Sequence, residues 1–182
     1  MDRFGTYFAH KIRRRRSERL RQSPQWQWHL DEVFVKIRGK TRYLWRAVDH
    51  EGEVLESYVT KTRDKSAALR FFKKTMKRYG APRTVVTDRL RPYGAAVKEI
   101  GNIDRQEVGR HLNNRAEKSH LPLRRRERAM LRFRRMSNLQ KFASTHASFH
   151  NHFNLERHIN HRQTFKLRRD AALLEWRQLV VG

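Results

Sequence analysis

The stretch WHLDEVFVKIRG, residues 28–39, carries the pattern that decides the fold. Its apolar positions are mostly β-branched or aromatic, and Gly39-Lys40 follows as a turn, which predicts a core strand over residues 26–38. Asp31 and Glu32 nevertheless stand in the middle of this strand. A buried carboxylate costs free energy unless it is paired, hydrogen-bonded or bound to a metal. The stretch therefore raises the question of why a core strand carries a carboxylate.

The chain as a whole is strongly basic. Its 182 residues include 43 Lys plus Arg against 18 Asp plus Glu, for a formal charge of +25, and 37% of them are hydrophobic. This balance indicates one domain with a modest core and a wide cationic surface, whose expected partner is a polyanion. Nucleic acid is the leading choice, and an anionic membrane is the weaker one.

Features that the sequence lacks narrow its location and its metal chemistry. It has no cysteine, which excludes disulfides and thiolate metal sites and fits a reducing cytoplasm. No stretch reaches the roughly 18 consecutive apolar residues of a membrane span, and the first residues show no secretion signal. We therefore expect a cytoplasmic, nucleoid-associated protein with no membrane partner and no small-molecule substrate.

Hydrophobic periodicity predicts a mixed α/β domain, in which an antiparallel meander precedes a helix, a fourth strand and further helices. The strands are expected at residues 26–38, 42–49, 53–60 and 83–88. The helices are expected at 64–79, at 93–100, from Asn113 or Asn114 to an interruption at Pro122, and at 124–136, 137–153 and 164–178. The domains are predicted as a basic arm or linker with a short helix at 6–15 (1–25), a main domain (26–160) and a C-terminal helical tail (161–182).

Three carboxylates stand at positions where a metal site is conceivable. Asp31 lies within a strand, Asp88 at the end of another, and Glu117 at the start of a helix. If the two strands are neighbours, the two aspartates face each other and repel unless a cation lies between them. Oxygen ligands without cysteine select Mg²⁺ or Mn²⁺. The residues alone leave an ordinary alternative open, in which the aspartates form caps, turns or salt bridges with arginine.

Longer sequence segments around these carboxylates resemble those of a known family. WHLDEVFVKIRGK, YLWRAVDHEGEVLE, VVTDRLRPYGAA and LNNRAEKSHLPLRRRERAMLRF, in this order, are similar to bacterial insertion-sequence transposases with a DDE catalytic triad, closest to the insertion-sequence-six family. The resemblance covers nearly the whole chain from about Phe4. It implies a ribonuclease H-like fold, that of retroviral integrases, with a mixed sheet and flanking helices.

The resemblance also implies a function and its residues. The triad would be Asp31, Asp88 and Glu117, and it would hold two catalytic metal ions, Mg²⁺ or Mn²⁺. The enzyme would be a DDE-type DNA transposase that cleaves DNA at insertion-sequence ends and joins the freed strand to a target. Its partners would be transposon ends, target DNA and a second copy of the chain in a homodimer. Arg124 matches the basic position that follows the family's glutamate.

Some positions depart from the family pattern. Arg89 stands where lysine is usual, Pro92 precedes Tyr93-Gly94, and Lys118 follows the glutamate. Family members also carry a helix-turn-helix before the catalytic domain, and only its trailing basic end is found here, so the chain resembles an N-terminally truncated member. The alternative function is therefore a catalytically inactive DNA-binding remnant. A third, weaker alternative is a basic RNA- or ribosome-associated protein.

Clusters of basic residues supply the expected DNA contacts, since arginine contacts phosphates and positions the duplex. The alternative is a solvated face, but the net charge of +25 and the resemblance favour phosphate contact. The predicted DNA-binding residues are Arg13, Arg14, Arg15, Arg16, Arg89, Arg124, Arg125 and Arg126.

Tryptophans and histidines each allow two interpretations. Tryptophans at positions 26, 28 and 45 are able to stack on bases, but on strands they are expected in the core. His146 and His150 have the spacing of a helical metal pair within the histidine-rich segment 146–161, but without cysteine or an HExxH pattern zinc is the minority interpretation.

Overall fold

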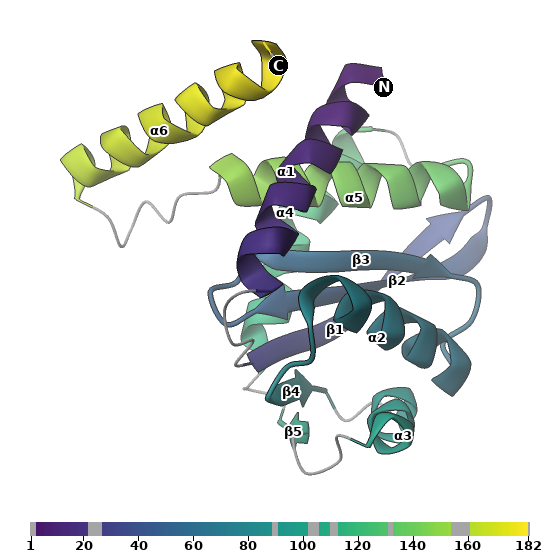
Figure 1. The fold of residues 1–182 in the computed structure, drawn as a ribbon. Helices are drawn as coiled ribbons and strands as arrows, with labels where there is room; N and C mark the ends of the chain where they lie inside the picture. The colour runs from purple at the N-terminus through teal and green to yellow at the C-terminus, as the bar shows by residue number, and fades with distance from the viewer. Residues whose placement is uncertain are drawn as a thin grey trace.

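The computed structural model describes residues 3–21, 27–88, 91–101, 106–109, 113–130, 133–153 and 161–181. Residues 28–37 of the stretch WHLDEVFVKIRG lie in β1 (Gln27–Ile37), which is the middle strand of a five-stranded sheet with the order β3-β2-β1-β4-β5 (Figure 1). The predicted mixed sheet with flanking helices is confirmed.

The first three strands form the predicted antiparallel meander. β1 pairs with β2 (Lys40–Asp49), and β2 pairs with β3 (Val54–Thr60). The turn between β1 and β2 contains Gly39, whose φ of 76° lies in the left-handed region that glycine adopts at little cost. The short turns fix the register, so that Asp31 lies directly opposite Arg46 on β2.

A helical crossover changes the strand direction from antiparallel to parallel. The Asp64 side chain accepts a hydrogen bond from the Ala67 N–H (2.8 Å) and caps α2 (Lys65–Tyr79), and Gly80 ends that helix. The chain then enters β4 (Thr84–Thr87), which runs parallel to β1. The neighbouring positions of the first and fourth strands, on which the carboxylate argument depends, are therefore confirmed.

The sheet has a fifth strand that the sequence did not predict. After α3 (Arg91–Ile100), β5 (Gln106–Val108) pairs in parallel with β4. Three residues, two of them polar, are too short to show an alternating pattern. The strand exists because β4 offers its free edge, which is a tertiary effect.

Helices cover both faces of the sheet and divide the core in two. α2 and α3 pack on one face, where Trp28 and Trp45 are fully buried, as predicted; Trp26 lies outside the described residues. α4 (Asn114–Ala129) and α5 (Met136–Phe153) pack on the other face. Successive strand residues alternate between these faces, so Asp31 faces the α4–α5 layer and Glu32 the α2–α3 layer.

Two helical predictions around α4 are wrong. Pro122 lies inside a continuous helix instead of interrupting it, and the helix expected over 124–136 ends at Ala129. Proline removes a single backbone donor, which the rest of a sixteen-residue helix tolerates here. The chain then leaves the helix so that Phe133 enters the core against Phe142, with ring centroids 5.2 Å apart.

The N-terminal helix is longer than the predicted 6–15. α1 (Arg3–Arg21) lies across α5 and buries Phe8, Ala9 and Ile12 (Figure 1). α6 (Arg162–Val181) is largely exposed and contacts α1 through Trp176, whose ring centroid lies 5.0 Å from that of Phe8. Among the described helices, none has the length and apolar character that crossing a membrane requires.

Candidate active site

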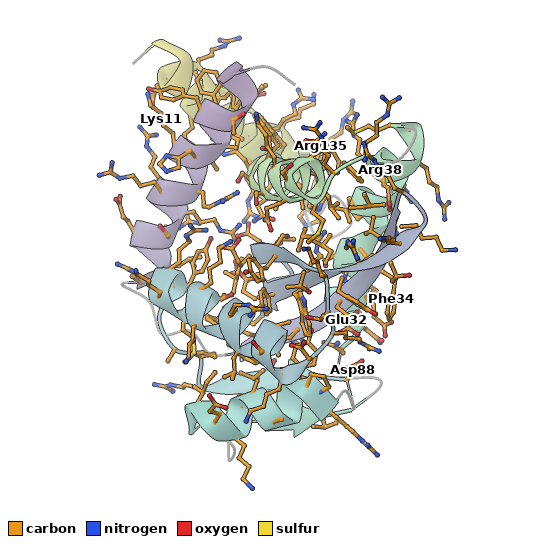
Figure 2. The ribbon with its side chains drawn as sticks, turned by 90° about the vertical axis from the view of Figure 1, so that its right-hand side faces the viewer. Lys11, Glu32, Phe34, Arg38, Asp88 and Arg135 are labelled. Atoms are coloured by element: carbon orange, nitrogen blue, oxygen red, sulfur yellow. The ribbon has the colours of Figure 1, made fainter. Side chains whose placement is uncertain are left out.

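Asp31 and Asp88 meet where β4 ends beside β1. Leu30 pairs with Thr87, the last residue of β4, and the residue that follows each of them in the chain is an aspartate. One carboxylate oxygen from each of Asp31, Glu32 and Asp88 lies within 4.8 Å of the others. Figure 2 shows Glu32 and Asp88 on the same side of the molecule. The structure thus brings together two of the three residues singled out in the sequence.

Glu32 is the member of this cluster that sequence reasoning missed. Its side chain is buried on the α2–α3 face, forms an ion pair with Arg63 and interacts with the Tyr93 side chain. Burial raises the pKa of Glu32, and the charge of Arg63 opposes that rise. The sequence signal for Glu32 was its position next to Asp31. Adjacent residues of a strand face opposite layers, so two consecutive acids place one carboxylate on each face of the sheet.

Asp31 has an unusual electrostatic environment. Burial, together with the charges of Glu32, Asp88 and Glu117, raises the pKa of Asp31 to about 7, although the Glu32 N–H donates to its Oδ1 (2.8 Å). His120 Nδ1 lies 3.7 Å from Asp31 Oδ2. Burial and the nearby Arg46 and Arg124 lower the pKa of His120 to about 3, so this imidazole is neutral near pH 7 and offers no countercharge.

Arg46 provides a buried cation behind Asp31. It lies opposite Asp31 on β2 and is 1% exposed, and its Nε and Nη1 have no hydrogen-bond partner among the described residues. Burial lowers the pKa of Arg46 to about 10, while the Asp31 carboxylate favours its charged form. Arg46 thus supplies a buried positive charge opposite Asp31, on the neighbouring strand.

Glu117 reaches the site from α4. Asn113, buried at the start of this helix, donates from Nδ2 to the Leu30 carbonyl oxygen (2.9 Å), which fixes the helix beside the residue that precedes Asp31. Glu117 lies on the first turn with an exposed side chain, and its charge acts on Asp31. It is not among the three described carboxylates that lie within 4.8 Å of one another.

The basic cluster of α4 lies near the carboxylates. Arg124 donates from Nη2 to the Phe34 carbonyl oxygen on β1 (2.6 Å) and pairs with Glu127 through Nη1 (2.7 Å). Arg125 and Arg126 are exposed. Arg124 is therefore tied to the strand that carries Asp31, while its two neighbours face solvent.

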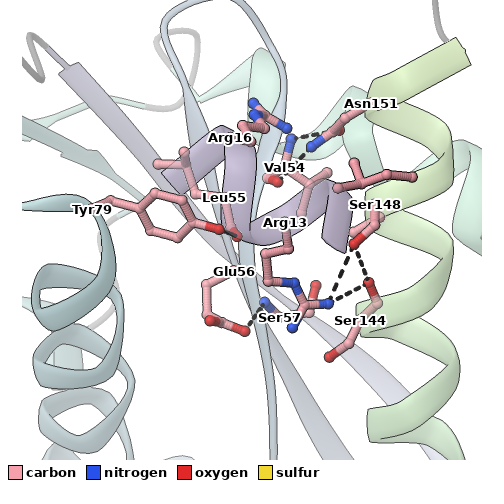
Figure 3. Close-up of a pocket in the computed structure, with 12 residues that line it drawn as sticks. Arg13, Arg16, Val54, Leu55, Glu56, Ser57, Tyr79, Ser144, Ser148 and Asn151 are labelled. Carbon is pink, nitrogen blue, oxygen red and sulfur yellow. Dashed lines mark hydrogen bonds between the residues drawn. The ribbon is translucent and has the colours of Figure 1, made fainter. Parts of the chain in front are cut away.

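The arginines of α1 have other surroundings. Arg13 donates to the Ser144 carbonyl oxygen (2.6 Å), and Arg16 pairs with Asp49 (3.2 Å) and Glu53. Figure 3 shows these two arginines at a cavity of about 20 Å³ between α1, α2, β3 and α5, a space that suits little more than one water molecule. None of the four acidic residues of the candidate site lines it.

The remaining two arginines of the run are exposed. Arg14 pairs with Glu18 (3.0 Å) on its own helix, and Arg15 lies 3.6 Å from Glu175 on α6. Arg89, the last predicted DNA contact, lies outside the described residues. The run at 13–16 is therefore divided between internal ion pairs and surface charges, and its role in DNA binding stays a prediction.

The histidine-rich helix shows ring stacking. His146 and His150 have ring centroids 5.7 Å apart and nearly parallel planes (14°), and burial lowers the pKa of His146 to about 4. Among the described residues, the acidic cluster is the one group of three or more side chains arranged to hold a metal ion. No such group includes these two histidines, so their described geometry gives no support to a zinc site.

Comparison with known families defines the class of protein. Residues 25–156 match the family model of a DDE domain, of the type found in IS240 transposases. The chain therefore belongs to the DDE transposases, within the insertion-sequence-six family. One hundred residues are 34% identical to the transposases of IS431mec and of IS257 in transposon Tn4003, both from Staphylococcus aureus, over 52% of this chain and 45% of each relative. The match thus spans less than half the length of these relatives.

The solved structures that the chain resembles include catalytic cores of retroviral integrases. The HTLV-2 integrase core in complex with magnesium superimposes with a TM-score of 0.54 at 14% identity, over 73% of this chain and 89% of that one. The BIV integrase core gives a TM-score of 0.51 at 14% identity, over 84% and 99%. At such identities the likeness shows the ribonuclease H-like fold alone, which confirms the fold expected from the sequence.

Proposed function

We propose that this chain catalyses metal-dependent cleavage and strand transfer of DNA at insertion-sequence ends, with Asp31, Asp88 and Glu117 as its catalytic residues. The observation that carries the proposal is the meeting of Asp31 and Asp88 at the end of two parallel strands, with Glu117 presented by α4. This arrangement occurs within a domain of the DDE family.

The donors at this site suit a hard divalent cation. All are carboxylate oxygens, and one oxygen from each of Asp31, Glu32 and Asp88 lies within 4.8 Å of the others. Such a set favours Mg²⁺ or Mn²⁺. When bound, a pair of these ions supplies activation of the attacking oxygen and stabilisation of the leaving oxygen in phosphodiester displacement. A related fold, the HTLV-2 integrase core, was solved with magnesium, which supports the choice.

The protein's own residues hold the site and the substrate. β1 and the Asn113–Leu30 hydrogen bond orient Asp31 and the first turn of α4 before any cation arrives. Arg125 and Arg126 are exposed on this helix and would contact phosphates, which positions the duplex without reading its sequence. The chain's formal charge of +25 supports DNA as the partner.

Assembly on DNA is part of the proposal. Two ends must be cut together, so we expect a homodimer on transposon ends and target DNA, acting at the nucleoid. An integrase with a related fold has been solved within an intasome, that of simian T-cell lymphotropic virus, which supports a multimeric nucleoprotein complex.

Nicking of supercoiled DNA tests the chemistry, because it does not depend on recognition of a particular end. With Mn²⁺, the wild type is expected to convert supercoiled plasmid to open circles, while Asp31→Asn and Asp88→Asn reduce the rate to background. Asp170→Asn is the matched control, since this carboxylate lies on α6 and its side chain is 60% exposed. Equal nicking by wild type and both site variants would exclude the carboxylates from catalysis.

The alternative is a DNA-binding protein without cleavage activity, which the excess of basic residues alone would support. It predicts salt-sensitive binding, with an affinity that falls steeply between about 50 and 200 mM salt. Binding retained by all variants, with no metal-dependent nicking by any of them, would favour this alternative over the enzyme.

A further inference from the structure

β1 continues beyond the end of β4, so among the described strands its residues after Leu30 pair on one side only, with β2. β4 pairs with β1 only from Gln27 to Leu30, whereas β2 pairs with it as far as Ile37. Phe34 lies on this part of β1, three residues after Asp31, and its side chain is 49% exposed. At roughly 3.3 Å per residue, about 10 Å of strand separates the two residues.

The ring of Phe34 is held in position by its neighbours. Tyr43 on β2 meets it edge to face, with centroids 5.5 Å apart, and the Arg63 guanidinium lies over it, 5.1 Å from the centroid. Arg63 is itself anchored by the buried carboxylate of Glu32, and Arg124 donates to the Phe34 carbonyl oxygen. An exposed aromatic ring supported in this way is preorganised for a flat ligand, because little side-chain freedom remains to be lost on binding.

We propose that Phe34 and Arg63 form a stacking platform for an unpaired base of the nucleotides that flank the scissile bond. This inference rests on the proposed DNA chemistry, to which it adds a substrate feature. Every base has an apolar face, and aromatic rings and guanidinium planes stack on it without reading sequence. A base inside a duplex presents no free face, so the platform selects a frayed or single-stranded end.

The location of the platform supports this occupant over a protein ligand. Figure 2 shows Phe34 beside Glu32, on the side of the molecule that also carries Asp88. Arg63 lies over the ring and Arg124 reaches the backbone carbonyl of Phe34, and these positive charges attract a nucleotide's phosphate. By the alternation along β1, Phe34 shares the sheet face of Glu32, whose carboxylate lies within 4.8 Å of those of Asp31 and Asp88. The base would therefore be held at the edge of the carboxylate cluster.

Fluorescence of 2-aminopurine tests the platform separately from catalysis. The full chain, carrying Asp88→Asn so that no cutting occurs, is titrated with an oligonucleotide duplex whose 2-aminopurine lies in a short single-stranded overhang. Stacking quenches this base, so we expect quenching with the parent protein and roughly 5- to 100-fold weaker binding with Phe34→Ala, the range that loss of one stacked base gives. Phe34→Trp should restore both signals.

Tyr7→Ala is the matched control, because Tyr7 is also an exposed aromatic ring under a cation. It is 52% exposed and Lys11 Nζ lies 4.7 Å from its centroid, but Figure 2 shows Lys11 on α1, away from the carboxylates. This variant should bind and quench as the parent does. A substrate with the 2-aminopurine paired inside the duplex should show little difference between Phe34→Ala and the parent.

Two results would overturn the platform. One is equal binding and quenching of the overhang by Phe34→Ala and its parent. The other is an equal loss of affinity for overhang and paired duplex, which would assign Phe34 a general structural or docking role. Neither result touches the nicking assay, so failure of the platform and failure of the carboxylate chemistry are distinguishable.

Discussion

Two acidic clusters lie on the same central hairpin, and they differ in how their charge is balanced. Asp49, at the end of β2, accepts hydrogen bonds from the N–H groups of Glu51 (3.0 Å) and Glu53 (2.9 Å) and pairs with Arg16. Glu53 pairs with the same arginine. At the other cluster, Asp31 has only the neutral His120 as a salt-bridge-distance partner among the described residues.

The difference separates a structural cluster from a candidate active site. Burial raises the pKa of Asp49 and of Glu53, and in both cases the charge of Arg16 is the first opposing influence. For Asp31, three neighbouring carboxylates add to the effect of burial. A buried acidic side chain by itself thus does not identify an active site. An aspartate whose neighbours are three carboxylates and a neutral imidazole, as at Asp31, is the informative observation, because a metal can supply positive charge there.

Removing the cation of the balanced cluster should have the largest effect on stability. Arg16→Met leaves two partly buried carboxylates without their partner, and we expect a loss of about 3–5 kcal/mol in the free energy of unfolding. Urea denaturation at pH 7 measures it. Arg14→Met is the control, because its ion pair with Glu18 is exposed and should contribute no more than about 0.5 kcal/mol. Equal losses would mean that the cluster around Arg16 is not a structural element.

The second prediction concerns pH in metal-free protein. The pKa of Asp31 is about 7 in the folded state against 3.8 for the reference group, so between these values the folded protein retains a proton that the unfolded chain has released. The contribution of Asp31 to stability is therefore present at low pH and is lost as pH rises from about 4 to 7, by up to roughly 4 kcal/mol in total.

Comparison of wild type with Asp31→Asn isolates this contribution. Urea denaturation in EDTA at pH 5, 6, 7 and 8 should show the variant gaining on the wild type as pH rises. Asp170→Asn, at an exposed carboxylate, should follow the wild type throughout. A constant difference between wild type and Asp31→Asn across this range would show that Asp31 has an ordinary pKa.

The third prediction is that Mn²⁺ reverses the imbalance at one cluster only. Ligand at about 100 times its dissociation constant stabilises a folded protein by about 2.7 kcal/mol. We expect a stabilisation of this order in wild type, measured by thermal unfolding at constant ionic strength, and its loss in Asp31→Asn and Asp88→Asn. Asp49→Asn should keep the Mn²⁺ response despite a lower starting stability. The same response in all four proteins would indicate non-specific binding.

The smallest expected effect is at the surface pair of Arg15 and Glu175. Their side chains are 54% and 48% exposed and 3.6 Å apart. Solvent screens such a pair, so Arg15→Ala should change the free energy of unfolding by less than about 1 kcal/mol in urea denaturation. A loss comparable to that of Arg16→Met would mean that α6 contributes far more to the fold than its exposed surface indicates.

Local sequence patterns were sufficient for the sheet and for part of the site. The alternation in β1, the glycine turn at Gly39 and the cap at Asp64 are local signals, and from them followed the meander, the crossover and the meeting of Asp31 with Asp88. The roles of these aspartates and of Glu117 in catalysis stay predictions.

Features that depend on distant contacts were not predictable. Glu32 joins the cluster because Arg63, from the loop before α2, reaches its buried carboxylate. β5 forms only against β4, and α1 extends beyond its predicted C-terminal limit because Arg16 and Arg21 find partners on β2 and α2. In the sequence alone, an arginine that pairs inside the protein and one that faces solvent look the same.

The unequal lengths of β1 and β4 also imply unequal rates of hydrogen exchange at their backbone amides. β1 is bonded to β2 along the whole of its course past Asp31, whereas Asp88 follows a strand of four residues whose outer neighbour has only three. Amides around Asp31 should therefore exchange with deuterium only on global unfolding, and those of β4 through local opening. Addition of Mn²⁺ should slow exchange in β4 while leaving β1 unchanged. Asp31 would then keep a fixed position, and Asp88 would adjust to it when the ion binds.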